Sequence, residues 1–152
     1  MAPKDLEEVL EIEETAFPNP YPLGYLRFLV KRNPETFLVA ENDRGIVGYV
    51  ISDVRHGNEG HIVSIAVRND ERRRGIARLL IRTVEGRLER EGADFVCLEV
   101  RRSNQPAINL YSSLGYRTTG IASRYYRDGE DAIKMTLTSL ARSSSHGIGE
   151  AR

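Results

Sequence analysis

The sequence Arg72-Arg73-Arg74-Gly75-Ile76-Ala77 joins two segments of different hydrophobic period. Residues 62–67 before it are apolar except for Ser64, and from residue 76 onward apolar side chains recur every three or four positions. The stretch therefore predicts a strand, a short basic loop and the first turn of a helix. The first amides of a helix have no partner within it and lie at the positive end of its dipole, so this junction can hold an anion. The alternative is a glycine turn with solvated arginines.

Length and composition favour one globular protein domain. The chain has 152 residues, of which 40% are hydrophobic and 29% are charged. We expect a single domain over residues 1–140 and a disordered Ser/Gly-rich tail over residues 141–152. The formal net charge of zero argues against nucleic acid or an acidic membrane as the main ligand.

The single cysteine, Cys97, excludes an internal disulfide and fits a reducing compartment. The sequence has no run of 18 apolar residues, and its N-terminal residues are acidic, unlike those of a signal peptide. We therefore expect a cytoplasmic protein.

Periodicity and turn residues predict an α/β fold with a central mixed twisted sheet of about six or seven strands and about four helices. A strand, a helix and a second strand follow one another over residues 61–100, which indicates a parallel pair of strands. Asp5 and Glu8 have the spacing of a capping box. In the helix after Gly75, the pattern places Leu79 on the apolar face and Glu85 on the polar face. Helices are expected at 6–15, 22–32, 76–91 and 104–114, and strands at 36–40, 46–54, 61–67, 95–100, 116–121 and 131–137.

Several phrases of the sequence resemble one protein family. The stretch 72–77 resembles the acetyl-CoA signature of the GNAT acetyltransferases, Arg/Gln-x-x-Gly-x-Gly/Ala. The whole set resembles the N-terminal protein acetyltransferases, close to archaeal relatives of the NatA catalytic subunit and to the ribosomal-protein-alanine acetyltransferases. The further phrases lie at residues 60–67, 98–101, 103–104, 107–111, 114–116 and 125–132. The resemblance covers residues 6–137 and implies the GNAT fold, with the parallel strands splayed apart in the middle of the sheet.

The resemblance implies transfer of the acetyl group of acetyl-CoA to a free protein α-amino group, by direct attack and without a metal. An α-amino group has a pKa of about 7.7 to 8.0, so a modest base suffices. By resemblance His61 and Glu99 are candidate bases, and Tyr111 is the candidate acid that protonates the departing thiolate. The structural alternatives remain open: Glu99 could pair with an arginine, His61 could end a strand, and Tyr111 could be a core residue.

The resemblance also assigns binding residues. The cofactor positions are Ile65, Ala66, Val67, Arg72, Arg73, Arg74, Gly75, Ile76, Ala77, Arg78, Asn104, Asn109 and Tyr111. Two aromatic loops are expected to clamp the peptide, through Phe17, Pro18, Tyr21, Tyr125 and Tyr126. Archaeal relatives often carry a glutamate where this chain has Asn19, which puts a second carboxylate base in doubt.

The expected partners are protein N-termini, including nascent chains at the ribosome, with no membrane and no dedicated nucleic-acid binding. We expect a monomer. The competing functions are acetylation of a small amine or a lysine side chain, a catalytically silent CoA-binding module, and an arginine-rich surface for the ribosome or RNA. The retention of His61, Glu99 and Tyr111 argues against a silent module.

Overall fold

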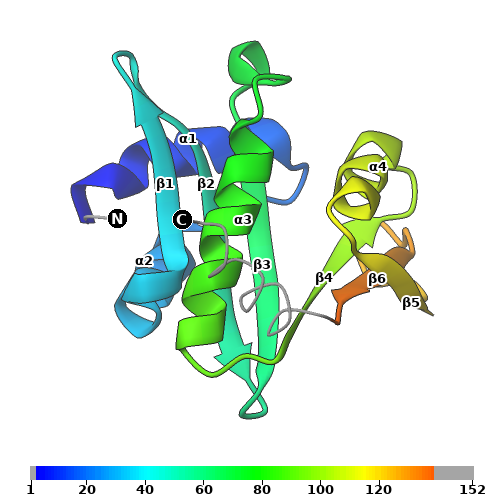
Figure 1. The fold of residues 1–152 in the computed structure, drawn as a ribbon. Coiled ribbons are helices and arrows are strands. Elements are labelled where there is room, and N and C mark those ends of the chain that lie inside the picture. The colour runs from blue at the N-terminus through cyan, green and yellow to red at the C-terminus, as the bar shows by residue number, and fades with distance from the viewer. Residues whose placement is uncertain (1–2, 139–152) are drawn as a thin grey trace. The chain divides into compact units, whose positions relative to one another are not determined.

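A computed structural model describes residues 3–138; the tail predicted for residues 141–152 lies outside this range. Within it the chain forms four α-helices and six strands, as predicted (Figure 1). The helices are α1 (Leu6–Ala16), α2 (Leu23–Arg32), α3 (Ile76–Arg90) and α4 (Gln105–Ser113). The strands are β1 (Phe37–Asn42), β2 (Gly45–Arg55), β3 (Glu59–Val67), β4 (Phe95–Arg101), β5 (Arg117–Ala122) and β6 (Ala132–Leu137). None of the helices in residues 3–138 is both long and apolar enough to cross a membrane.

The strands are hydrogen-bonded in the order β1-β2-β3-β4-β6-β5, so β3 and β4 occupy the middle of the series. These two strands are parallel, in a register that runs from Glu59 opposite Phe95 to His61 opposite Cys97. The pairs β1·β2, β4·β6 and β5·β6 are antiparallel. The predicted mixed sheet with a central parallel pair is therefore confirmed, and the splay of that pair stays a prediction.

The chain divides into two compact units. The described part of the first comprises residues 3–53 and 63–87, and that of the second comprises residues 54–62 and 88–138. The boundary falls inside β3, so this strand contributes residues to both units. The prediction of one domain over residues 1–140 stays a prediction.

The first unit has its own apolar core. Helix α1 contributes Leu6, Val9 and Ile12, which recur three residues apart and therefore share one face of the helix. Helix α2 contributes the buried side chains of Leu26 and Leu29 in the same way. The strand residues of this core are Phe37, Ile46, Tyr49, Ile51 and Ala66.

The predicted capping box at the start of α1 is wrong. Asp5 precedes the helix, but its side chain makes no capping hydrogen bond. Glu8 instead accepts a hydrogen bond from the backbone N–H of Ile46 at 3.0 Å. The register of the β1·β2 pair shifts at a bulge between Ala40 and Glu41, where Glu41 faces Ile46. At this irregularity the Ile46 amide donates its hydrogen bond to the Glu8 carboxylate.

The predicted apolar face of α3 is wrong at two positions. Leu79 is 63% exposed, whereas Glu85 is only 6% exposed and accepts a hydrogen bond from Arg82 at 2.8 Å. The buried apolar stripe consists of Leu80, Ile81, Val84 and Leu88. The buried stripe is thus rotated around the helix axis relative to the predicted one, since Ile81 is buried and Leu79 is exposed.

Candidate active site

His61 and Glu99 are in direct contact on the neighbouring strands β3 and β4. The distance from His61 Nε2 to Glu99 Oε1 is 2.7 Å. His61 lies opposite Cys97 in the register, and Glu99 is two residues further along β4, on the same face of the sheet. Both side chains are largely buried, with 11% and 14% of their surface exposed. The structure thus brings together the two residues that the sequence nominated as bases.

The surroundings of this pair keep Glu99 ionised. Burial by itself would raise the pKa of Glu99, and the hydrogen bond and charge of His61 act in the opposite direction. The positive charges of Arg55 and Lys134 add to this effect, and the pKa lies below its ordinary value of 4.5. A carboxylate can only accept a hydrogen bond, so His61 Nε2–H is the donor and Nδ1 is left as the acceptor nitrogen.

Sequence reasoning missed the basic residues around the pair. Lys134 on β6 lies directly opposite Glu99 in the antiparallel register, and no local pattern in the sequence indicates this neighbour. Arg55 ends β2 and donates a hydrogen bond to Glu59 at 2.8 Å. For a third basic residue, Arg101, the sequence does hold a signal. The two-residue period of a strand puts Arg101 on the same face of β4 as Cys97 and Glu99.

Cys97 is the buried thiol next to the pair. Its Sγ donates a hydrogen bond to Glu59 Oε2 at 2.9 Å. Burial and the negative charge of Glu59 raise the pKa of the Cys97 thiol to about 12. This cysteine therefore stays protonated at neutral pH.

The basic stretch of residues 72–77 has the geometry of an anion cradle. Arg73 and Gly75 have left-handed φ angles of 66° and 79°, and helix α3 starts at the next residue, Ile76. A Cβ atom added to Gly75 would meet no atom within 4 Å, so the backbone there is open to a ligand. The amides of the first turn have no helical partner, and the arginines of the stretch are exposed. These residues fit a pyrophosphate.

Comparisons with known proteins agree with this geometry. The model of the acetyltransferase (GNAT) family matches residues 6–116. The chain belongs to the GNAT acetyltransferase family. It is 41% identical over 133 residues to an uncharacterized N-acetyltransferase of Methanocaldococcus jannaschii, covering 87% of this chain and 85% of the relative. It is 37% identical over 143 residues to the N-alpha-acetyltransferase of Sulfurisphaera tokodaii, covering 86% of each. Its fold matches the crystal structure of Ard1 from Thermoplasma volcanium with a TM-score of 0.87 and 28% identity, over 91% of this chain and 94% of the other.

Two arginines of the GNAT signature are engaged within the protein. Arg72 donates a hydrogen bond from Nε to the carbonyl oxygen of Val67 at 3.2 Å. Arg74 lies 3.3 Å from Glu71 Oε1, close enough for an ion pair although the two atoms do not form a hydrogen bond. Arg73 and Arg78 are exposed, and Ile76 and Ala77 are half-buried at the start of α3. The predicted strand positions Ile65, Ala66 and Val67 end β3 in the same unit.

The remaining predicted cofactor residues of this GNAT domain lie on α4. Asn104 caps the helix, as expected, because its side chain accepts a hydrogen bond from the amide of Ala107 at 3.2 Å. Asn109 is exposed and accepts a hydrogen bond from Gln105 at 2.8 Å. Tyr111 is 7% exposed, and burial together with the charge of Tyr126 raises its pKa. The Tyr111 hydroxyl therefore holds its proton to high pH. Its cofactor contact and that of the two asparagines stay predictions.

One of the two aromatic loops contacts Arg101, which lies two residues after Glu99 on β4. Burial raises the pKa of Tyr126 to about 12, and the negative charges of its surroundings, including Glu99, contribute to this rise. The ring of Tyr125 is 5.0 Å from that of Tyr126 in an edge-to-face arrangement. The guanidinium of Arg101 lies 4.1 Å from the centre of the Tyr126 ring.

Arg101 also joins this loop to its own acidic residues. It forms ion pairs with Asp128 at 2.8 Å and with Glu130 at 2.9 Å. Glu130 in turn accepts a hydrogen bond from the backbone N–H of Ser103 at 2.8 Å. The bonds from Ser103 and Arg101 lower the pKa of Glu130 to about 2. The loop is thus fixed at several points, and Arg101 is a contributor that the sequence analysis did not single out.

The other aromatic loop follows α1. Phe17 and Tyr21 are half-buried, and Pro18 is exposed between them. The rings of Tyr21 and Tyr25 are 5.0 Å apart, so the end of the loop packs against the first turn of α2. The peptide contacts of Phe17, Pro18, Tyr21, Tyr125 and Tyr126 stay predictions.

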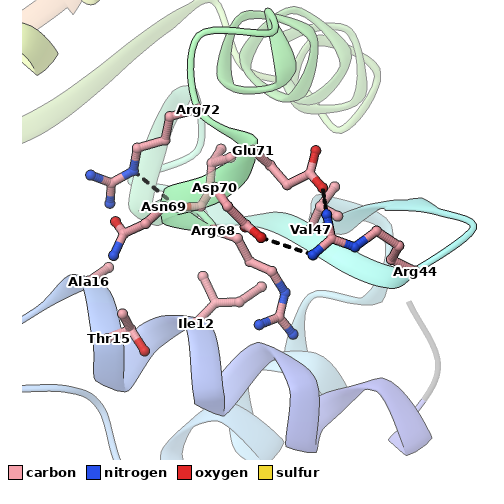
Figure 2. A pocket seen from close by; sticks show the side chains of 11 residues that line it. Ile12, Thr15, Ala16, Arg44, Val47, Arg68, Asn69, Asp70, Glu71 and Arg72 are labelled. Atoms are coloured by element: carbon pink, nitrogen blue, oxygen red, sulfur yellow. Dashed lines mark hydrogen bonds and ion pairs between the residues drawn. The ribbon is translucent and has the colours of Figure 1, made fainter.

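A cavity of about 480 Å³ lies between the end of α1 and residues 67–72 (Figure 2). Arg44 reaches across it to Asp70 at 2.9 Å and to Glu71 at 3.1 Å. Its lining consists of Ile12, Thr15, Ala16, Arg44, Val47, Val67, Arg68, Asn69, Asp70, Glu71 and Arg72. Two of these, Val67 and Arg72, were predicted cofactor residues, whereas His61, Glu99 and Tyr111 do not line the cavity. No cluster of three His, Cys, Asp or Glu side chains with metal-binding geometry occurs within residues 3–138.

Proposed function

We propose that the chain transfers the acetyl group of acetyl-CoA to the α-amino group of protein N-termini. The observation that carries this proposal is the buried contact between His61 and Glu99 in a chain of the GNAT family. The name of the Sulfurisphaera relative, N-alpha-acetyltransferase, supports an α-amine as the acceptor.

The basic stretch is proposed to hold the pyrophosphate of acetyl-CoA. The left-handed residues Arg73 and Gly75 turn the backbone so that the free amides of the first turn of α3 face an anion. The strand residues 65–67 would accept and donate hydrogen bonds to the rest of the cofactor. When bound, acetyl-CoA supplies the activated acetyl group as a thioester.

His61 is the proposed acceptor of the proton from the attacking amine. Glu99 has a pKa below its ordinary value, so its carboxylate is a weak base at neutral pH. Histidine is the side chain best suited to accept a proton near pH 7. In this arrangement Nδ1 of His61 takes the proton, and Glu99 orients the ring through Nε2–H and stabilises the imidazolium that forms. An α-amino group, with a pKa of about 7.7 to 8.0, is partly neutral at pH 7, so this base need not be strong.

Tyr111 is the proposed hydrogen-bond donor to the departing thiolate. Its raised pKa keeps the hydroxyl protonated, so that it is available as a hydrogen-bond donor. A thiol has an ordinary pKa near 8.5, well below that of the Tyr111 hydroxyl, so CoA leaves as a thiolate that Tyr111 stabilises by a hydrogen bond, and the hydroxyl keeps its own proton.

The two aromatic loops are the proposed peptide clamp, with Asn19 in place of the acidic residue that archaeal relatives often carry. We further propose that the enzyme works as a cytoplasmic monomer on finished or nascent chains. Acetylation of a small amine or of lysine is the competing reaction.

The test is acetylation of peptides that start with Ser, Ala, Thr or Met, each made with a free and with a blocked N-terminus and each carrying one internal lysine. We expect transfer to the free peptides alone, followed by mass spectrometry of the modified residue. Equal reaction of the blocked peptides would show that lysine is the acceptor. Reaction of a free small amine in preference to every peptide would favour the small-amine alternative.

A further inference from the structure

Glu13 is a carboxylate inside the apolar core of the first unit. It lies on α1 and is only 2% exposed. Its Oε1 accepts hydrogen bonds from the hydroxyl of Tyr49 and, at 3.3 Å, from that of Ser64. Its Oε2 accepts a hydrogen bond from the backbone N–H of Tyr21 at 2.9 Å. A buried carboxylate is unfavourable without such donors, so this residue has a role that an apolar side chain of the same size could not fill.

Glu13 closes both ends of the proline-rich loop that follows α1. Its carbonyl oxygen accepts a hydrogen bond from the N–H of Phe17 at 3.0 Å, and its side chain accepts one from the N–H of Tyr21. Pro18 and Pro20 between them have no N–H to offer. The first of these is the backbone bond that ends α1 and does not depend on the side chain, so the Glu13 carboxylate fixes the exit of the five-residue segment 17–21.

The opposite side of the Glu13 carboxylate is fixed by the sheet. Tyr49 lies on β2 and Ser64 on β3, and their hydroxyl oxygens are 3.2 Å apart. Burial and the charge of Glu13 raise the pKa of Tyr49, so this donor keeps its proton. Ser64 directly precedes Ile65, the first of the three strand residues assigned to the cofactor. The hydrogen-bonded chain thus connects the loop 17–21 to that strand within one unit.

We propose that Glu13 is a positioning residue that holds the loop 17–21 in the conformation that receives the N-terminal peptide. The proposal rests on the function proposed above. A loop that is already ordered loses less conformational entropy when it binds a ligand. The anchor therefore contributes to peptide affinity, whereas none of the hydrogen-bond donors to the Glu13 side chain is a residue assigned to acetyl-CoA or to proton transfer.

Three variants test the hydrogen bonds of Glu13, including the one from Tyr21. The double variant E13L/Y49F replaces the carboxylate and its tyrosine donor by apolar groups of similar volume, but it leaves the Tyr21 N–H and the Ser64 hydroxyl without their Glu13 acceptor. Y49F alone keeps that acceptor and is the matched control. E13Q keeps a neutral acceptor of the same size, which forms a weaker bond.

Two measurements read out the anchor. Amide hydrogen exchange of Tyr21, followed by NMR, reports the loop directly and needs no substrate. The KM for a peptide with a free N-terminus reports whether the anchored loop contributes to peptide binding. It is compared with kcat and with the KM for acetyl-CoA, which should not depend on the loop.

We expect wild type and Y49F to protect the Tyr21 amide, E13Q to protect it less, and E13L/Y49F to leave it exchanging fast. Peptide KM should rise about threefold in E13Q and about tenfold in E13L/Y49F, with kcat and the acetyl-CoA KM within about twofold, because one charge-assisted hydrogen bond is lost.

The proposal is overturned if E13L/Y49F folds and keeps either the Tyr21 protection or the wild-type peptide KM. If the double variant does not fold, unchanged Tyr21 exchange in E13Q overturns it. If no form of the enzyme acetylates an N-terminus, the proposed function is wrong, and so is the N-terminal peptide as the ligand of the loop. The hydrogen-exchange data still decide whether Glu13 fixes the loop.

Discussion

Glu13 and Glu99 are both shielded carboxylates that accept hydrogen bonds from other elements of the fold, but their partners differ in kind. The donors to Glu13 are an amide and two hydroxyl groups, none of which changes charge near neutral pH. The donor to Glu99 is the ring of His61, which can gain or lose a proton. Arg55 and Lys134 add positive charge around Glu99.

This difference separates holding a structure from moving a proton. Neutral donors fix the position of the Glu13 carboxylate and, through it, of the loop 17–21. A titratable donor lets Glu99 stabilise a charge that appears on its partner during a reaction. Glutamate thus has two different roles in this protein. Which role it has depends on whether its hydrogen-bond donors can change their protonation state.

The largest expected effect is on turnover when the titratable partner is removed. H61A should lower kcat by roughly 10² to 10⁴, the range of general base catalysis, with little change in the acetyl-CoA KM. Steady-state kinetics with a free-N-terminus peptide measure this. The matched control is H56N, which changes an exposed histidine at a left-handed backbone position that asparagine tolerates. A loss in H61A of less than about threefold would mean that His61 has only a structural role in β3.

The next largest effect is on the free energy of unfolding when the Glu13 carboxylate, which accepts three hydrogen bonds, is removed. E13A leaves the Tyr21 amide and the hydroxyls of Tyr49 and Ser64 without their acceptor, which should lower the free energy of unfolding by about 3 kcal/mol. Urea denaturation measures this value. E14A, at the exposed neighbouring position, should change it by less than about 0.5 kcal/mol. Equal effects of the two variants would show that the Glu13 cluster contributes no stability.

A smaller effect concerns the pH dependence of stability. The folded pKa of Glu99 lies below its ordinary value of 4.5, so its contribution is present above pH 4.5 and is lost as the pH falls through the folded pKa. In H61A the lowering contribution of His61 is lost while burial still acts to raise the Glu99 pKa, so Glu99 contributes less stability above pH 4.5 than in wild type. The stability difference between wild type and H61A should therefore shrink as the pH falls from 5 to 3.

Urea denaturation series at several pH values, with H56N as the reference, give this difference. A constant difference between wild type and H61A over the whole interval would show that His61 does not set the ionisation of Glu99.

The smallest effect extends the comparison to the loop that carries Tyr125 and Tyr126. Several contacts hold this loop, so R101K, which keeps the charge but loses the planar stacking on Tyr126, should raise the peptide KM by only about twofold to threefold. R102K at an exposed neighbouring position is the control. A rise as large as that of E13L/Y49F would mean that Arg101 is the sole anchor of its loop.

Local patterns in the sequence predicted most of the fold. Helical spacing located α1 and α3, proline and capping residues located α2 and α4, and β-branched runs located the strands, because these signals depend on residues a few positions apart. The errors at Glu8, Leu79 and Glu85 have a different origin. Each side chain was assigned from its own helix, whereas the final position of Glu8 depends on a β2 amide 38 residues away and those of Leu79 and Glu85 on tertiary packing.

The candidate site was predictable only where a family resemblance supplied long-range information. It nominated His61 and Glu99 together, although they are 38 residues apart. It did not nominate Glu13, whose hydroxyl partners lie 36 and 51 residues away. The one local signal for this residue is its spacing of seven from Leu6 and four from Val9, which puts a carboxylate on the apolar stripe of α1. Lys134 was missed for the same reason, because only the β4·β6 register places it opposite Glu99.

The hydrogen bond from Cys97 to Glu59 has a consequence for the chemical resistance of the enzyme. Thioesters and alkylating electrophiles are attacked by thiolates, and Cys97 is the one cysteine of the chain. A thiol with a pKa of about 12, bonded to a carboxylate and buried, carries almost no thiolate at neutral pH. The protein can therefore hold an activated thioester without acylating itself on sulfur, and the acetyl group remains available to the incoming amine.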